Sequence, residues 1–126
     1  MRLLLDTNVV IRAVYEPSRL PAAVADTLRE PENAVFFSAA VVWELAIKSS
    51  LGKLSYHPEP ARRGLAARGF IELPITGQHG EETHSLPWLH RDPFDRIMIA
   101  QARVESLVLV TTDRQLSRYN VQHLLV

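Results

Sequence analysis

Acidic residues that follow apolar runs are the first candidates for chemistry in this chain. Asp6 follows the apolar run 3–5, and Asp113 follows the apolar run 107–110 and two threonines. If these runs are neighbouring strands of a parallel sheet, both carboxylates lie at the edge of the sheet where ligands bind in such folds. Each aspartate could also do no more than cap the helix that follows it, since aspartate is a favoured N-cap residue.

A third acid, Glu44, interrupts the apolar stretch 39–47. A buried carboxylate without a partner is costly, so this side chain must reach solvent, a counter-charge or a metal ion. The alternative is an ion pair with Lys48 one helical turn later, which would contribute only ~0.2–0.5 kcal/mol.

The fourth acid, Asp95, belongs to the segment Asp92-Pro93-Phe94-Asp95. Asp92 is predicted to be the N-cap of a helix that Pro93 begins, and an acid in the first turn is favoured by the helix dipole. The continuation 97–100 is apolar on all sides, which indicates a buried helix. Its N-terminus should therefore lie at the edge of the core, near the sheet.

Gathered around one pocket, the four acids would form a metal site. Carboxylates crowded together repel one another and need a counter-charge, which a divalent cation provides. Because the donors are hard oxygens, without cysteine and without a cluster of histidines, they favour Mg²⁺ or Mn²⁺ over Zn²⁺. Such an ion can activate water for an in-line displacement at phosphorus. The residues predicted to be both catalytic and metal-binding are Asp6, Glu44, Asp95 and Asp113.

The elements that must position these acids alternate along the chain. Strands are expected at 2–6, 34–38, 70–73, 107–110 and near 121–125. Helices are expected from about residue 8 and over 21–30, 39–51, 58–68, 77–87 and 92–106, with a further short one before the last strand. Thr7 or Asn8 is placed to cap the first helix and Ser38 the third. This alternation predicts an α/β fold, a three-layer α/β/α sandwich with a mostly parallel central sheet.

Length and composition set bounds on the class of protein. The 126 residues fit one domain spanning 1–126, and 47% apolar residues are enough for a core. The absence of cysteine excludes disulfides and thiolate metal sites. Asp6 interrupts the first apolar run, so we expect no signal peptide there, and no run reaches the ~20 residues of a membrane helix. We expect a soluble, cytoplasmic protein without a membrane partner.

The charge balance is mild evidence against a nucleic-acid binder. The net charge is zero, whereas such proteins are often basic overall. However, 12 of the 14 basic residues are arginine, whose planar guanidinium suits phosphate. The arginines near the predicted site, which would have to supply phosphate affinity, are Arg12, Arg91, Arg96 and Arg114.

Four blocks of the sequence, in order, resemble the PIN-domain family and most closely its VapC-like toxins. They are Leu-Leu-Leu-Asp-Thr-Asn at 3–8, the block from Ser38 to Lys48, His-Arg-Asp-Pro-Phe-Asp-Arg and its continuation at 90–102, and Leu-Val-Thr-Thr-Asp at 109–113. The resemblance implies a parallel sheet between helices, with the same four acids binding Mg²⁺ or Mn²⁺. It also implies a ribonuclease toxin of a toxin–antitoxin pair, with an RNA substrate, a small cognate antitoxin and a homodimer.

Neighbours of the acids have less specific expected roles. Thr7, Thr111 and Thr112 are candidates to hydrogen-bond the acids or to act only as strand-end and capping hydroxyls. Asp92 is expected to cap the helix or to support the metal ligands without binding the ion itself. Tryptophans 43 and 88 are expected in the core or an interface rather than as platforms for bases. The histidines fit no metal spacing, and His90 is the one near enough to the acids to touch RNA.

Three alternative functions also combine an α/β domain with clustered acids. A receiver-type signalling domain would need adjacent acids after the first strand and a late lysine, but Asp6 stands alone and the last lysine is Lys53. An inactive PIN-like module that binds RNA or an antitoxin would retain the fold without the chemistry. A nuclease acting on DNA remains open, because no residue recognisably reads a 2′-hydroxyl.

Overall fold

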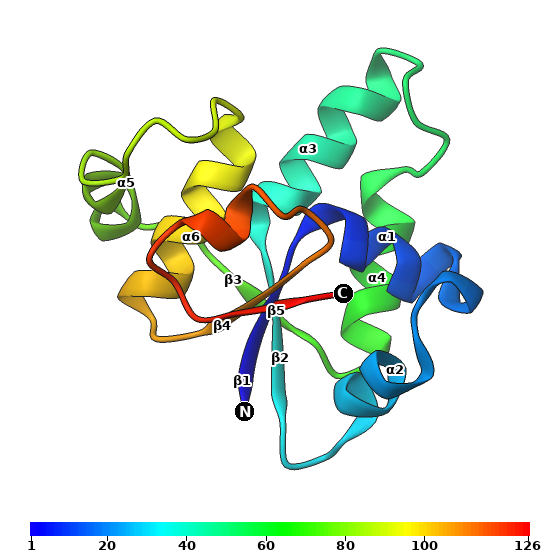
Figure 1. The fold of residues 1–126 in the computed structure, drawn as a ribbon. Helices are drawn as coiled ribbons and strands as arrows, with labels where there is room; N and C mark the ends of the chain where they lie inside the picture. Colours follow the sequence, from blue (N-terminus) through cyan, green and yellow to red (C-terminus); the bar gives the residue numbers. More distant parts are fainter.

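The computed structural model describes residues 1–126, and its centre is a sheet of five parallel strands (Figure 1). The strands are β1 (Arg2–Leu5), β2 (Ala34–Ser38), β3 (Ile71–Leu73), β4 (Val108–Thr111) and β5 (His123–Leu125). Their order across the sheet is β3-β2-β1-β4-β5, so β1 is central. This arrangement confirms the predicted parallel α/β/α sandwich.

Helices connect successive strands and cover the sheet. They are α1 (Thr7–Tyr15), α2 (Ala22–Arg29), α3 (Ala39–Ser50), α4 (Pro58–Ala67), α5 (Gly77–Thr83) and α6 (Pro93–Val104), with 3₁₀ turns at η1 (Pro17–Arg19) and η2 (Leu116–Arg118). Figure 1 shows α1, α2 and α4 on one side of the strands and α5 and α6 on the other. Helix α3 contacts both α4 and α6, so it links the two groups.

The apolar composition of β1 follows from its central position in the sheet. Leu3 pairs in register with Val35 of β2 and with Val108 of β4. Since helices cover both faces of β1, Leu3 and its two neighbours Leu4 and Leu5 are fully buried. β1, β2 and β4 end side by side, which brings together the starts of the segments that follow them.

The helix ends confirm most of the predicted boundaries and correct one cap. Ser38 Oγ accepts a hydrogen bond from Ala40 N at 3.0 Å, as predicted for the cap of α3. The expectation that Thr7 or Asn8 caps α1 is wrong, because Asp6 has this role. Gly69 has a φ of 77°, a left-handed conformation suited to the end of α4.

Both tryptophans are exposed on the single chain, so the core half of the expected core or interface position is wrong for each of them. The exposed fraction is 60% for Trp43 and 75% for Trp88. Trp43 packs edge-on against Phe94 with ring centroids 5.2 Å apart. None of the helices has the length and apolar character needed to cross a bilayer.

Candidate active site

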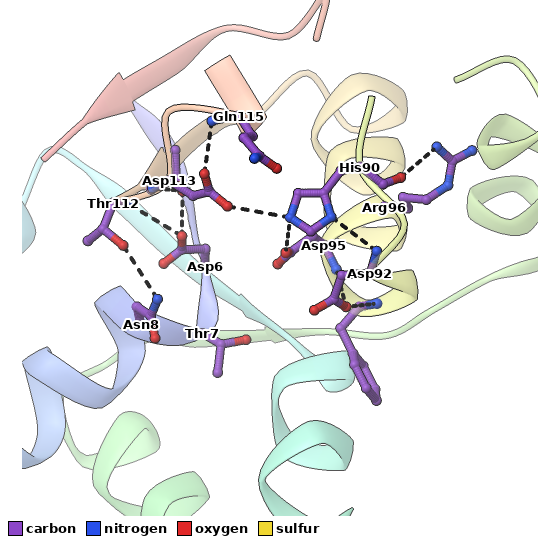
Figure 2. Close-up of polar contacts among 12 residues, drawn as sticks. Asp6, Thr7, Asn8, His90, Asp92, Asp95, Arg96, Thr112, Asp113 and Gln115 are labelled. Carbon is purple, nitrogen blue, oxygen red and sulfur yellow. Dashed lines mark hydrogen bonds and ion pairs between the residues drawn. The ribbon is translucent and has the colours of Figure 1, made fainter. Parts of the chain in front are cut away.

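Asp6 lies buried at the carboxyl end of β1 (Figure 2), and both of its carboxylate oxygens accept hydrogen bonds. Oδ1 accepts a hydrogen bond from Val9 N at 2.9 Å, which caps α1. Oδ2 accepts from Thr111 Oγ1 at 2.5 Å and from the backbone N–H of Thr112 at 3.4 Å. Burial raises the pKa of the Asp6 carboxyl, and the Asp113 carboxylate adds to the rise, whereas the hydrogen bonds oppose it. Asp6 is therefore both a cap and a carboxylate held between two strand ends.

Asp92 and Asp95 occupy the start of α6 as predicted. Asp92 Oδ1 accepts from Phe94 N at 2.8 Å and from Asp95 N at 3.4 Å, so it is the N-cap. The pKa of Asp95 is raised to about 7, mainly by burial and next by the Asp92 carboxylate, while His90 opposes the rise. Glu44 and Asp6 also raise this pKa. The carboxyl of Asp95 therefore lies among other acids, and their negative charges disfavour its ionised form.

Asp113 follows β4 and faces the same space. Its Oδ1 accepts from Gln115 N at 2.8 Å, and its backbone N–H donates to Thr111 Oγ1 at 3.0 Å. Its Oδ2 is directed at His90 Nε2, 3.4 Å away (Figure 2). Asp113 thus stabilises the local turn with one oxygen and presents the other to the site.

Glu44 is buried on α3 and already has two partners. Oε1 accepts from Thr7 Oγ1 at 2.6 Å, and Oε2 lies 2.5 Å from Lys48 Nζ. The hydrogen bond to Glu44 raises the pKa of Lys48, and the carboxylates of Asp92 and Asp95 raise it further. The ion pair with Lys48 therefore forms within electrostatic reach of the other acids, and Thr7 joins Glu44 to the start of α1.

His90 is the residue at the site that its sequence position suggested least. Its Nε2 lies 3.3 Å from Asp95 Oδ2 and 3.4 Å from Asp113 Oδ2. Ligand atoms of these three residues all lie within 4.8 Å of one another, close enough to hold one metal ion. The sequence did contain one indication of this position. His90 precedes the predicted helix cap Asp92 by two residues, so it had to lie close to the acids at the start of that helix.

Arg96 is not available to bind phosphate, which corrects its place among the candidate arginines. Its buried guanidinium donates to backbone carbonyl oxygens of the segment that precedes α6. The ring of Trp88 covers it at 3.7 Å. Arg91 and Arg114 are exposed beside the acids in the chain and remain candidates, as does the half-buried Arg12.

The side chains at this edge fit a hard divalent cation. Asp6, Asp95 and Asp113 come from the ends of β1 and β4 and the start of α6, and Glu44, on α3, is near enough to Asp95 to raise its pKa. All four offer carboxylate oxygens, the donors that Mg²⁺ and Mn²⁺ prefer. Burial is the main cause of the raised pKa of Asp95, and the neighbouring carboxylates of Asp92, Glu44 and Asp6 add to it by repelling its negative charge. A cation of this type would relieve that repulsion.

The two turn-forming aspartates should respond differently to substitution. Asp92→Ala removes the cap of α6 and is expected to cost ~0.5–2 kcal/mol of stability, with activity falling only as the protein unfolds. Asp113→Asn retains the oxygen that accepts from Gln115 N, so its melting temperature should stay nearly unchanged while its half-saturating Mg²⁺ concentration rises. Melting curves and metal titrations of both variants test this. A stable Asp92→Ala that needs more metal, with a normal Asp113→Asn, would reverse the two roles.

The fold and the site define a parallel α/β protein with an acidic cluster at the carboxyl edge of its sheet. A model of the PIN domain matches residues 3–122. The chain belongs to the PIN domain family, whose members are generally nucleases.

Solved structures share this fold over almost the whole chain. A structure of VapBC2 from Rickettsia felis bound to promoter DNA superposes with a TM-score of 0.75 at 18% identity, covering 98% of both chains. DNA-bound VapBC from Salmonella typhimurium gives 0.72 at 19% identity, covering 98% of this chain and 97% of the other. VapBC-1 from nontypeable Haemophilus influenzae gives 0.68 at 20% identity, covering 99% and 98%. No curated protein sequence matches significantly.

Proposed function

We propose that this protein is a metal-dependent ribonuclease, a single nuclease domain over residues 1–126 that acts as the toxin of a VapBC-type pair. The observation that carries the proposal is the convergence of Asp6, Asp95 and Asp113 at one edge of the sheet, where ligand atoms of Asp95 and Asp113 lie within 4.8 Å of each other. Repulsion within such a cluster lowers the stability of the folded protein. A reaction that depends on a bound cation would account for the presence of the cluster. The PIN fold supports a nuclease, and the RNA preference rests on the likeness to VapC-type toxins.

Each acid would have a defined part in holding Mg²⁺ or Mn²⁺. Asp6, Asp95 and Asp113 would be ligands, and Glu44 would complete the set directly or through water. When bound, a divalent cation supplies positive charge at the reacting phosphate and favours the ionised form of water. The residues of the chain fix the geometry, because Thr111 orients Asp6 and Thr7 orients Glu44.

An antitoxin and a second copy of the chain are the proposed protein partners. Three of the structural neighbours are VapBC proteins, two of them bound to DNA. An antitoxin would hold the nuclease inactive until it is removed. Trp43 and Trp88 expose large apolar rings on a single chain, as residues of an interface do.

Nuclease assays on labelled single-stranded RNA and DNA test the function. Cleavage of RNA is expected with Mg²⁺ or Mn²⁺, and none after the metal is stripped and a chelator is added. Asp6→Asn is the matched inactive control, since asparagine also caps a helix and should leave α1 intact. Full activity in chelator would refute the metal mechanism, and preferential cleavage of DNA would reassign the substrate. A folded, metal-loaded protein that cleaves neither would be a binding module.

A further inference from the structure

A backbone contact of His90 indicates which ring nitrogen carries the proton when the imidazole is neutral. The backbone N–H of Asp92 donates to His90 Nδ1 at 3.0 Å (Figure 2). A nitrogen that accepts a hydrogen bond carries a lone pair, so the proton of the neutral ring is on Nε2. The Nε2–H group is the one that faces Asp95 Oδ2 and Asp113 Oδ2, at 3.3 and 3.4 Å.

This tautomer makes His90 a donor to the acids rather than a ligand of a cation. A protonated ring nitrogen has no lone pair to offer a metal ion, and Nδ1 is already engaged with the backbone. When both are ionised, Asp95 and Asp113 carry like charges and repel each other. The polar Nε2–H group, 3.3 and 3.4 Å from the two Oδ2 atoms, attracts both oxygens and favours their lying side by side.

The position of the ring is held by a network that has no direct contact with the acids. The backbone N–H of His90 donates to Tyr119 Oη at 2.9 Å. Arg96 also donates to Tyr119 Oη, at 3.3 Å, and binds the carbonyl oxygens of Pro87 and His90 at 2.9 and 3.5 Å. Figure 2 shows Arg96 directed at the His90 backbone, away from the carboxylates. Buried Tyr119 and Arg96 therefore fix where the segment places the imidazole.

We propose that His90 is a positioning residue whose Nε2–H group holds Asp95 and Asp113 at the spacing that a shared divalent cation requires. The inference rests on the proposed function, because it assigns these two carboxylates to one cation. Arg96 and Tyr119 act through His90, since they hold the backbone that carries the ring.

Mn²⁺ binding to the full chain, measured without substrate, tests the inference. After metal stripping, free Mn²⁺ is followed by electron paramagnetic resonance during a titration. His90→Leu is expected to bind Mn²⁺ about 10-fold or more weakly than wild type, as when a residue that orients a ligand is lost. His90→Gln should recover most of the affinity, because its amide N–H can face the same oxygens. Tyr119→Phe should weaken binding in the same direction but less.

Two further readouts separate positioning from a purely structural effect. Nitrogen-15 shifts of the metal-free protein should show the His90 proton on Nε2. At saturating Mn²⁺, kcat of His90→Leu should fall less than its apparent Mn²⁺ affinity. The matched control is His84→Leu, an exposed histidine in the same segment, which should bind Mn²⁺ like wild type.

The outcomes distinguish this inference from the proposed function. Wild-type affinity or tighter binding in His90→Leu, or a proton on Nδ1, would overturn the positioning role while the nuclease assignment stands. Loss of affinity in His90→Gln as large as in His90→Leu would also overturn it, because the donor would not be what matters. A wild-type protein that binds no Mn²⁺ would refute the metal mechanism itself.

Discussion

Replacing Asp95 by asparagine is expected to lower nuclease activity roughly 100-fold or more, because a lost metal ligand removes several kcal/mol of transition-state stabilisation. The fold should survive, since the cap of α6 is Asp92 and not Asp95. Initial rates on labelled RNA at several Mg²⁺ concentrations measure the effect. The matched control is Asp26→Asn, an exposed aspartate on α2, which should keep the wild-type rate. A wild-type rate in Asp95→Asn would show that this residue does not hold the cation.

The same variant should be more stable than wild type in metal-free buffer above neutral pH. The folded-state pKa of Asp95 is raised from 3.8 to about 7, so the folded protein binds this proton more tightly than the unfolded chain does. The stabilising contribution is complete below about pH 4 and is lost as pH rises through about 7. Asparagine resembles the protonated acid at every pH and should escape this loss.

Melting temperatures from pH 4 to 8, with chelator and with Mg²⁺, measure this linkage. Wild type should lose stability across this range without metal, on the order of a few kcal/mol, while Asp95→Asn loses less. Asp6 contributes a remaining slope of the same sign, because its pKa is also raised. Mg²⁺ should restore the wild type but not the variant. Parallel pH profiles for the two proteins would contradict the assignment of the raised pKa to Asp95.

Arg96→Met is expected to cause a large loss of stability, although the residue lies outside the group of acids. The guanidinium donates to the carbonyl oxygens of Thr83 and Leu86 at 3.1 and 3.3 Å, besides that of Pro87. Hydrogen bonds from charged donors contribute about 1.5–3 kcal/mol each, and methionine retains only the apolar stem. We expect a loss of at least about 2 kcal/mol, or on the order of 10 °C in melting temperature.

Thermal and urea unfolding of Arg96→Met should be compared with those of Arg63→Met. Arg63 is exposed on α4 and lies 3.8 Å from Glu59, so its replacement should change stability by less than ~0.5 kcal/mol. A similar small effect in Arg96→Met would mean that water replaces the guanidinium without cost. The segment 83–90 would then be held by other contacts.

The sequence determined the layers of the fold and the edge at which the acids lie. The uninterrupted apolar run 3–5 predicted a buried strand, and the structure places it at the centre of the sheet. In a parallel sheet all strands point the same way, so Asp6 and Asp113 had to leave it at one edge. The cap Asp92 and the acid Asp95 followed from local helix chemistry, which depends on neighbours in the chain.

Contacts between distant segments decided what local patterns could not. Glu44 has one local and one distant partner. Lys48 is one helical turn away and could be predicted, whereas Thr7 is 37 residues away in the sequence and could not. The same limit hid the role of Arg96, which looked like any other arginine near the site. Its guanidinium is buried because Tyr119, 23 residues later, and the segment 83–90 close around it.

His90 is the clearest case of a residue whose role only the tertiary structure decided. One histidine in the sequence has no partner that periodicity or spacing can identify. Its neighbours Asp95 and Asp113 belong to different elements, and the distance between them depends on how α6 packs beside β4. Local chemistry thus determined which acids reach the edge of the sheet, and long-range packing determined which group stands between them.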